Sequence, residues 1–398
     1  MISGNENLLY IAEAYPQLIS EFEKQGLGNY FKSENLNKIG KFIKLNTVLS
    51  SHKINPVLFI ESLNKQLENQ TDQNVLVETD LGSLDFSAML PCGLRNPFKE
   101  YCESYFASYP TLFSELKMLI EGNVNHELSY YPLLDSIEDV DELPDVIMAS
   151  DINNFFHKPF VERFIEKGAF EAYQPYHLNP YLEKVEYSDP LGYYTMFTAN
   201  MLVMVVDKKQ LGDRKMPERW SDLLAPEFEN SIIMRGEDDF FCNAVLLPFY
   251  KDHGMEAIGK LAKNIRKGMH PAEMVKAANK KDGGEAAVYI MPWFFSKRLK
   301  NDEVEVVWPT DGAIASPVFL LVKKGKAEEK DALLNFLMSK ETGELLRDRF
   351  FPSTHPDCNN NHLHDEVKWL GWDFLRNHDV GKLKEDIREN FMQVWNKK

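Results

Sequence analysis

Cysteine is scarce in this chain, and no two cysteines are closely spaced. Only four occur in 398 residues, Cys92, Cys102, Cys242 and Cys358, and none of them forms a C-x-x-C motif. A chain of this length can build its core without a disulfide framework. We therefore predict four free thiols, as expected in a reducing compartment.

Long apolar segments are also missing. The longest strongly apolar runs, Met201–Val206 and Phe319–Val322, are far shorter than the ~20 residues of a membrane span. Residues 1–20 lack the basic start, the long apolar stretch and the small-residue cleavage site of an export signal. We expect a soluble protein without a membrane span that, as the sequence is written, stays in the cytoplasm. If the chain had been trimmed of a leader, we would expect it outside the cytoplasm.

Positive charge is in deficit. Lys and Arg total 45 against 61 Asp and Glu, which gives a formal net charge of -16. Binding to nucleic acid or to an anionic membrane needs positive charge to displace counterions. The charge balance therefore argues against nucleic acid as a partner.

Common catalytic and cofactor motifs are absent as well. The sequence contains no GxSxG, HExxH or GxGxxG motif. Residues 254–261 approach a phosphate-binding loop, but Leu261 replaces the Ser or Thr that would hold magnesium, and Ile258 and Leu261 instead fit one face of an amphipathic helix. We predict neither an ATPase nor a bound cofactor.

The first part of the chain has the pattern of a small helical domain, residues 1–70. Leu8, Ile11 and Tyr15 follow helical spacing, and Pro16 is placed to begin a second helix. Residues 71–83 follow a polar segment without periodicity and are expected to form a linker.

From residue 84 the pattern changes to short apolar strands that alternate with helices, which is typical of open α/β sheets. The expected strands are Leu84–Leu90, Asp145–Ala149, Ser231–Met234 and Ala286–Ile290. Two longer extended segments, 194–206 and 304–322, favour two lobes joined by a pair of crossing strands. We assign residues 84–195 and 305–398 to lobe 1 and residues 196–304 to lobe 2.

Three motifs in this part resemble a known family. They are Pro217–Pro226 (PERWSDLLAP), Gly284–Tyr289 (GEAAVY) and Trp308–Pro317 (WPTDGAIASP). Together they resemble type II solute-binding proteins of ABC importers, with the ferric-iron branch as the nearest match, over residues 84–350. The resemblance implies a two-lobed α/β fold, a cleft that closes on a small-molecule ligand, and an ABC permease as a possible partner.

Residues 1–70 separately resemble a small helical domain of unknown function, found in anaerobes and sometimes ahead of iron–sulfur repair proteins. The similar segments are Leu8–Pro16, Gly26–Gly28 and Gly40–Phe42. Members often carry a cysteine after the glycine pair, whereas this chain has Asn29 and Tyr30 there. Because this domain is separate from the rest of the chain, one expectation is that another protein docks on it.

Candidate ligand-binding residues come from the loops that follow the strands, because ligands of α/β sheets lie beyond the carboxyl ends of the strands and at helix N-termini. The last of the three family-like motifs adds an aspartate. The candidates are Cys92, Gly93, Arg95, Asn153, Asn154, Arg235, Glu237, Asp238, Trp293 and Asp311.

Two of these candidates are arginines that directly follow a strand. Arg95 and Arg235 can grip a carboxylate or phosphate, and the alternative for each is an ordinary ion pair with a nearby acid. Residues 251–281 form a basic stretch with two possible interpretations. Its positive charge favours an anionic ligand, or it is the solvated face of two helices. Asn153 and Asn154 either bind the ligand or cap the following turn, and we expect capping for one of them.

The sequence contains two further candidate sites. Cys92 near a helix N-terminus can act as a nucleophile with His157 or Glu237 as its base, or it is a small buried thiol. A second candidate is a metal site, because four residues of metal-ligand type lie close together: His355, Cys358, His362 and His364. The alternative is an exposed loop, since this stretch is rich in proline and asparagine. The tyrosine pair Tyr193–Tyr194 does not stand where ferric-binding relatives place theirs, so iron ligands do not transfer.

The sequence therefore predicts a non-catalytic protein that binds a small, anionic solute in a cleft between two lobes. Two alternatives stay open. One is an enzyme on the same fold that uses Cys92 as nucleophile. The other is an intracellular sensor in which residues 1–70 report lobe closure to another protein.

Overall fold

The computed structural model describes residues 2–32, 35–36, 40–52, 54–60, 62–64, 67, 81–122, 131–237, 240–280 and 282–397. The chain forms two compact units, Met1–Thr79 and Asp80–Lys398. Each unit is described on its own.

The N-terminal unit is helical, as the sequence predicts. Its elements are α1 (Leu8–Ala14), η1 (Pro16–Leu18), α2 (Ile19–Lys24), η2 (Gly28–Phe31) and α4 (Leu45–Ser51). Leu8, Ile11 and Phe22 are fully buried in its core. The end of α2 is followed by Gly26 at a positive φ of 76°, a conformation that glycine adopts without strain. In the expected linker, residues 71–80 lie outside the described residues, and Leu81–Ser83 form a short 3₁₀ turn, η4.

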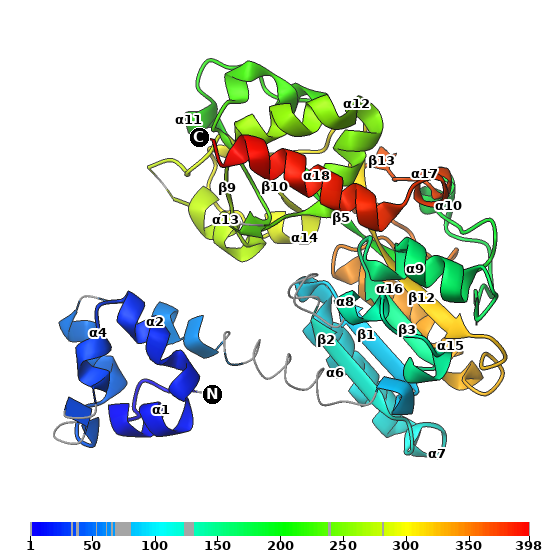
Figure 1. The fold of residues 1–398 in the computed structure, drawn as a ribbon, viewed down its shortest axis with the longest axis horizontal. Coiled ribbons are helices and arrows are strands. Elements are labelled where there is room, and N and C mark those ends of the chain that lie inside the picture. The colour runs from blue at the N-terminus through cyan, green and yellow to red at the C-terminus, as the bar shows by residue number, and fades with distance from the viewer. Residues whose placement is uncertain are drawn as a thin grey trace. The chain divides into compact units, whose positions relative to one another are not determined.

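The C-terminal unit is built on one sheet in which the described residues form eleven strands, with the main order β2-β1-β3-β12-β5-β10-β6-β9. In its first lobe, β1 (Phe86–Leu90) pairs in parallel with β2 (Met118–Gly122) and β3 (Val146–Ser150). Helices α6 (Cys92–Ser108), α15 (Asp331–Leu337) and α16 (Lys340–Asp348) lie beside these strands (Figure 1). β1 and β3 are buried along their whole length because elements cover both faces of the sheet.

The second lobe repeats this plan. β6 (Ile232–Met234) pairs in parallel with β9 (Ile265–Gly268) and β10 (Val288–Pro292). Its helices include α12 (Asn243–Asn264), α13 (Pro271–Ala278) and α14 (Trp293–Ser296). Ile258 and Leu261 are fully buried on α12, so the segment that approaches a phosphate-binding loop is an amphipathic helix, as expected.

Two long antiparallel strands join the lobes. β5 (Thr195–Asp207) pairs with β12 (Ala313–Lys323) near its start and with β10 near its end, while the last part of β12 pairs with β3. The second extended segment of the sequence is in fact two strands, β11 (Val304–Val307) and β12, separated by a turn at Gly312, whose φ is 97°. Only β12 crosses between the lobes. The two-lobed α/β fold expected from the motifs is confirmed.

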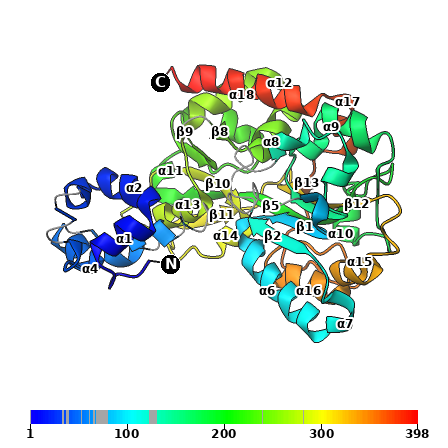
Figure 2. The same ribbon diagram turned by 60° about the horizontal axis from the view of Figure 1, so that its bottom comes forward.

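The last helix departs from the assignment of residues 305–398 to lobe 1, whereas Trp372 before it packs on Tyr194 of the first lobe. After β13 (Val367–Lys368) and α17 (Trp372–Asn377), α18 (Val380–Trp395) runs along α12 of the second lobe (Figures 1 and 2). The ring centroid of Phe391 lies 4.5 Å from that of Phe241, two residues before α12 begins at Asn243. Amphipathic periodicity predicts a helix but does not say which lobe its apolar face will cover.

Shorter elements complete the unit. They are α7 (Pro110–Phe113), α8 (Tyr131–Leu134), η5 (Val140–Glu142), η6 (Asn154–Phe156), α9 (Lys158–Phe160), the π-helix η7 (Val161–Ile165), β4 (Phe170–Glu171), α10 (Pro180–Glu183), α11 (Lys208–Leu211), η8 (Trp220–Leu224), η9 (Pro226–Phe228), β7 (Gly236–Glu237) and β8 (Phe240–Phe241).

Candidate functional site

A cavity lies where the carboxyl ends of strands from both lobes meet the crossing strands. The first lobe contributes the residues after β1 and β3, the second lobe contributes those after β6 and β10, and β5 and β12 form the wall between them. Its volume is about 60 Å³, which admits a few water molecules and is well below the ~300 Å³ of a typical ligand pocket. The lobes are therefore closed around a small space.

Three helices of at least eight residues begin at this cavity, namely α6, α12 and α13. Neither Pro91 before α6 nor Cys242 before α12 caps its helix with a side chain. The first N–H groups of these helices and their dipoles therefore favour negative charge in the cavity. Arg235, predicted from its place after β6, lines the same cavity and adds a full positive charge.

Asp151, which was not among the residues predicted from the sequence, also lines the cavity. This residue directly follows β3, has a positive φ of 69°, and is buried. Its N–H donates to the carbonyl of Pro317 on β12 at 2.7 Å, and its Oδ1 accepts from the N–H of Ile152 at 2.7 Å. The sequence signal was present, because aspartate is among the residues that tolerate this left-handed conformation at the end of a strand.

Asn200 and His270 were not predicted either. Asn200 lies within β5, where an apolar run hides it, and its Oδ1 is buried without a hydrogen-bond partner among the described residues. Such an oxygen is costly to bury unless a ligand or a water donates to it. His270 precedes α13, and its Nδ1 accepts from the N–H of Ala272 at 3.2 Å.

Two thiols line the cavity from opposite lobes. Cys92 is the first residue of α6 and is exposed, whereas Cys242 precedes α12 and is buried. Burial, with a smaller contribution from the charge of Asp151, raises the pKa of Cys242 to about 11. The bases suggested for Cys92 do not line this cavity. His157 contacts Asp135 and Lys384 elsewhere, and Glu237 lies exposed on β7.

Arg95 lies on α6 but does not line the cavity. Its guanidinium donates to Oε2 of Glu121 at 2.7 Å, and Glu121 belongs to β2, the strand next to β1. The geometry therefore favours the ion-pair alternative for Arg95. The neighbouring Gly93 has a packing role, since a Cβ at this position would overlap the ring of Phe294 from the opposite lobe.

The two asparagines act mainly within the first lobe. Asn153 Oδ1 accepts from the N–H of Phe155 at 2.9 Å and its Nδ2 donates to the carbonyl of Ser150 at 3.1 Å, which is the expected capping role. Asn154 Nδ2 donates to Oδ2 of Asp135 at 2.8 Å. Neither side chain lines the small cavity.

The remaining candidates lie apart from the cavity. Trp293 packs its ring under Lys297, with Nζ 3.4 Å from the ring centroid, and it is Phe294 and Phe295 that form the apolar wall. Asp311 Oδ1 accepts from the N–H of Trp220 at 3.2 Å, a structural contact. Asp238 lies outside the described residues.

The four suggested metal ligands are not brought together. No three of His355, Cys358, His362 and His364 place ligand atoms within 4.8 Å of one another. Cys358 is buried against the carbonyl of Lys340, and the ring of His364 stacks on Trp308. Burial, helped by the nearby charges of Arg347 and Lys297, lowers the pKa of His362 to about 4.

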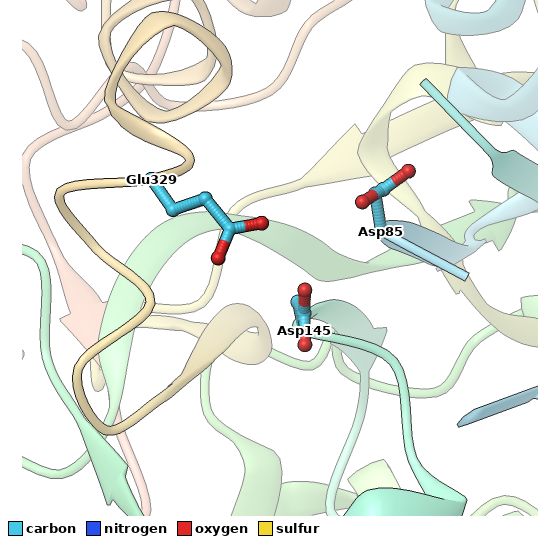
Figure 3. Close-up of side chains that lie close together, drawn as sticks. All are labelled: Asp85, Asp145 and Glu329. Atoms are coloured by element: carbon cyan, nitrogen blue, oxygen red, sulfur yellow. The ribbon is translucent and has the colours of Figure 1, made fainter. Parts of the chain in front are cut away.

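One acidic cluster does have the geometry of a cation site, and a lysine already fills it. Asp85, Asp145 and Glu329 point toward a common space in Figure 3. The ammonium of Lys330 lies 2.5 Å from Asp85 Oδ1, 3.3 Å from Asp145 Oδ2 and 2.7 Å from Glu329 Oε1. Hydrogen bonds from Lys326 and Lys330 lower the pKa of Glu329 to about 2. The cluster is an ion-pair network.

Three of the eight basic residues in the stretch over residues 251–281 form ion pairs with other described residues. Lys267 and Lys280 both pair with Glu285, at 2.5 and 2.9 Å, and Lys260 pairs with Glu256 at 2.7 Å. The prediction of four free thiols is confirmed. No helix in the described part of the chain is long and apolar enough to cross a membrane.

Two α/β lobes that meet at strand ends around a cavity, and are joined by antiparallel crossing strands, define a hinged binding protein of the periplasmic-binding-protein class. The family comparison agrees. The chain belongs to the bacterial extracellular solute-binding protein family, whose model matches residues 141–378, more than half of the chain. It is thus a solute-binding protein of ABC-transport type, as the motifs predicted. No curated protein has a significant sequence match with it.

Solved structures share the fold at low sequence identity. The ferric-binding protein from Campylobacter jejuni is 13% identical with a TM-score of 0.55, and the comparison covers 79% of this chain and 99% of that one. An ABC transporter protein from Clostridium perfringens is 16% identical with a TM-score of 0.54, covering 79% and 100%. A protein described as a two-component signal-transduction protein is 17% identical with a TM-score of 0.56, covering 76% and 99%.

Proposed function

We propose that this protein binds a small anionic solute, without turning it over, in the cavity between its lobes. The observation that carries the proposal is Arg235, which faces the cavity alongside the uncapped starts of α6 and α12. Arg235 offsets the carboxylate of Asp151, which lines the same cavity, and the N–H groups at the two helix starts add the positive potential that favours an anion.

The size of the cavity restricts the solute. At about 60 Å³ the closed cavity fits an anion of a few heavy atoms, such as a small carboxylate or an inorganic oxyanion. A larger organic acid or phosphate ester requires the lobes to open by hinge motion. The buried Oδ1 of Asn200 favours a solute that also donates a hydrogen bond.

Ferric ion is not the proposed solute, although one structural match is a ferric-binding protein. No tyrosine lines the cavity among the described residues. Tyr194 of the pair before β5 is buried in the first lobe and donates its hydroxyl to the carbonyl of Phe155 at 2.9 Å. A phenolate ligand for iron would first have to break this bond.

Titration calorimetry with acetate, oxalate, phosphate and sulfate tests the proposal. We expect at least one of these anions to bind, and Arg235→Ala to weaken it by about 10- to 150-fold, the effect of losing a charge-assisted hydrogen bond. Arg266→Ala, which removes an exposed arginine on β9, is the matched control and should leave the affinity unchanged. Equal affinities for wild type and Arg235→Ala would place the anion elsewhere.

Binding without turnover is tested on the same samples. The solute recovered after long incubation should be chemically unchanged by NMR, and Cys92→Ser should not alter this result. Conversion of the solute by wild type and not by Cys92→Ser would instead support the enzyme that uses Cys92.

A second candidate function is a solute sensor that signals through the helical unit. It is favoured by the separate core of that unit, formed by residues such as Leu8, Phe22 and Leu49. The structural match described as a signal-transduction protein points the same way. Hydrogen exchange on the full chain tests this idea: altered protection in residues 2–67 on anion binding supports a sensor, and unchanged protection supports a simple binding protein.

A further inference from the structure

A second and larger cavity lies beside the C-terminal helix, and we call it the α18 groove. It is bounded by Asp135, Asn154 and His157 from the first lobe, by Phe241, Asn243 and Leu246 from the second, and by one face of α18. Its volume is about 350 Å³, within the ~300–1,000 Å³ range of small-molecule sites. It shares no lining residue with the small cavity described above.

On one side of the groove lies the carboxylate of Asp135, of which one oxygen has hydrogen-bond partners and the other has none among the described residues. Asp135 Oδ2 accepts from Asn154 Nδ2 at 2.8 Å and contacts His157 Nδ1 at 3.2 Å. Asp135 Oδ1, by contrast, is buried and has no hydrogen-bond partner among the described residues. A buried carboxylate oxygen is stabilised by a donor, and an ammonium group provides a donor with the opposite charge.

The local lysine is held elsewhere. Lys384 Nζ lies 3.1 Å from His157 Nε2, so a neutral His157 with its proton on Nδ1 can donate to Asp135 and accept from Lys384. The ammonium of Lys384 is therefore directed at the far side of the imidazole ring. The open position at Asp135 Oδ1 remains for a ligand.

The groove also presents groups for a carboxylate. Arg388 lies on α18 one turn after Lys384 and makes no hydrogen bond or ion pair with any described residue. Asn243 is the first residue of α12, whose start has no side-chain cap. A guanidinium and free helix N–H groups are the usual partners of a carboxylate.

Apart from Glu385 on α18, the rest of the groove lining is mostly apolar. The rings of Phe241 and Phe391 lie 4.5 Å apart, and Leu246 and Met392 line the groove with them. Acidic, basic and apolar groups thus surround one space of a size suited to a small organic molecule.

We propose that the α18 groove binds a zwitterionic amino compound with an apolar side chain, such as an apolar amino acid. Its ammonium group binds Asp135, its carboxylate binds Arg388 and the start of α12, and its side chain packs on the phenylalanine rings. The two sites border the same start of α12, with Ala244 and Val245 lining the small cavity and Asn243 lining the groove, but this proposal does not depend on Arg235. Because the walls come from both lobes and from α18, the ligand favours the closed arrangement.

Calorimetry on the full chain with L-phenylalanine and L-leucine tests the site. Phenethylamine and 3-phenylpropionate serve as probes that keep the ring and one of the two charges. We expect an amino acid to bind at millimolar concentration or better, and the single-charge analogues to bind at least about tenfold more weakly than phenylalanine. No binding of either amino acid, or equal binding of the three phenyl compounds, would overturn the proposal.

Variants then locate the site. Arg388→Ala should weaken amino-acid binding about tenfold, whereas Lys382→Ala on the exposed face of the same helix should not. Asp135→Asn should have a similar effect, with Asp386→Asn as its control, and thermal unfolding should verify that each variant is folded. If Arg235→Ala removes amino-acid binding and Arg388→Ala does not, the amino acid occupies the small cavity and the groove proposal is wrong.

Discussion

The backbone of Gly93 at the start of α6 is covered by the ring of Phe294 at the start of α14, across the boundary between the two lobes. A Cβ at position 93 would overlap that ring. Only glycine allows the lobes to approach this closely, so the contact couples a single residue to cleft closure.

We therefore expect Gly93→Ala to disfavour the closed state and to weaken anion binding several-fold while the protein still folds. Small-angle scattering should show a larger radius of gyration for the variant in the presence of the anion. Gly259→Ala is a matched control, because a Cβ there meets only ordinary contacts at 3.8 Å. Unchanged affinity and size in Gly93→Ala would mean that Phe294 moves aside without effect.

The second prediction concerns α18, which packs on the second lobe through Phe391 and reaches the first lobe through Lys384. Lys384→Ala removes the contact with His157, so we expect a larger open population and a modest, about two- to threefold, loss of anion affinity, the size of a weak polar contact. Lys382→Ala serves as the control. An affinity equal to wild type would show that α18 does not restrain opening.

The third prediction concerns the ion-pair network at Asp85, Asp145 and Glu329. Lys330→Ala removes the cation that the three carboxylates share and leaves Lys326 beside Asp145 and Glu329, and we expect a loss of about 1–3 kcal/mol in the free energy of unfolding. Calcium or magnesium should restore part of this loss in the variant but not alter wild type. Thermal unfolding with and without the ions measures both effects, and an equal ion response in the two proteins would contradict the assignment of Lys330 as the resident cation.

The fourth prediction concerns pH. Burial and neighbouring cations lower the pKa of His362 to about 4 from its ordinary value of about 6.5, so the unfolded chain takes up this proton before the folded chain does as the pH falls. Stability should therefore decline between pH 6.5 and pH 4, by about 1–3 kcal/mol from this group.

His362→Phe should remove that decline, because both ring nitrogens of His362 are buried without a hydrogen-bond partner among the described residues and the ring lies beside that of Phe350. Chemical unfolding at a series of pH values measures it, with the exposed His253→Phe as control. A variant that keeps the wild-type slope below pH 6.5 would assign the effect to another group.

Much of the architecture follows from local sequence patterns. Buried strands such as Val146–Ser150 are short apolar runs that end at polar residues, and helix starts such as Pro271 carry their own signals. Arg235 was predicted as a site residue for this reason, since the end of a strand can be located without knowing what lies opposite.

The same reasoning does not place Arg95 at the cavity, because Arg95 lies in the first turn of α6 rather than directly after the strand. Its partner Glu121 lies on β2, and only the parallel pairing of β1 with β2 places that carboxylate beside it. A metal site was also suggested by residues that lie close together in the sequence, namely His355, Cys358, His362 and His364. In the folded chain no three of them bring their ligand atoms within 4.8 Å of one another, so closeness in sequence does not make a metal site.

The sequence by itself determined the fold class, the crossing strands and the ends of the strands that point at the cleft. These depend on periodicity and on the preferences of single residues, which act over a few positions. Tertiary structure decided which side chains share the cavity, that Asp151 and Asn200 belong to it, and that α18 covers the second lobe. Those outcomes depend on contacts between residues far apart in the chain, and such contacts are set by the packing of whole elements rather than by local preference.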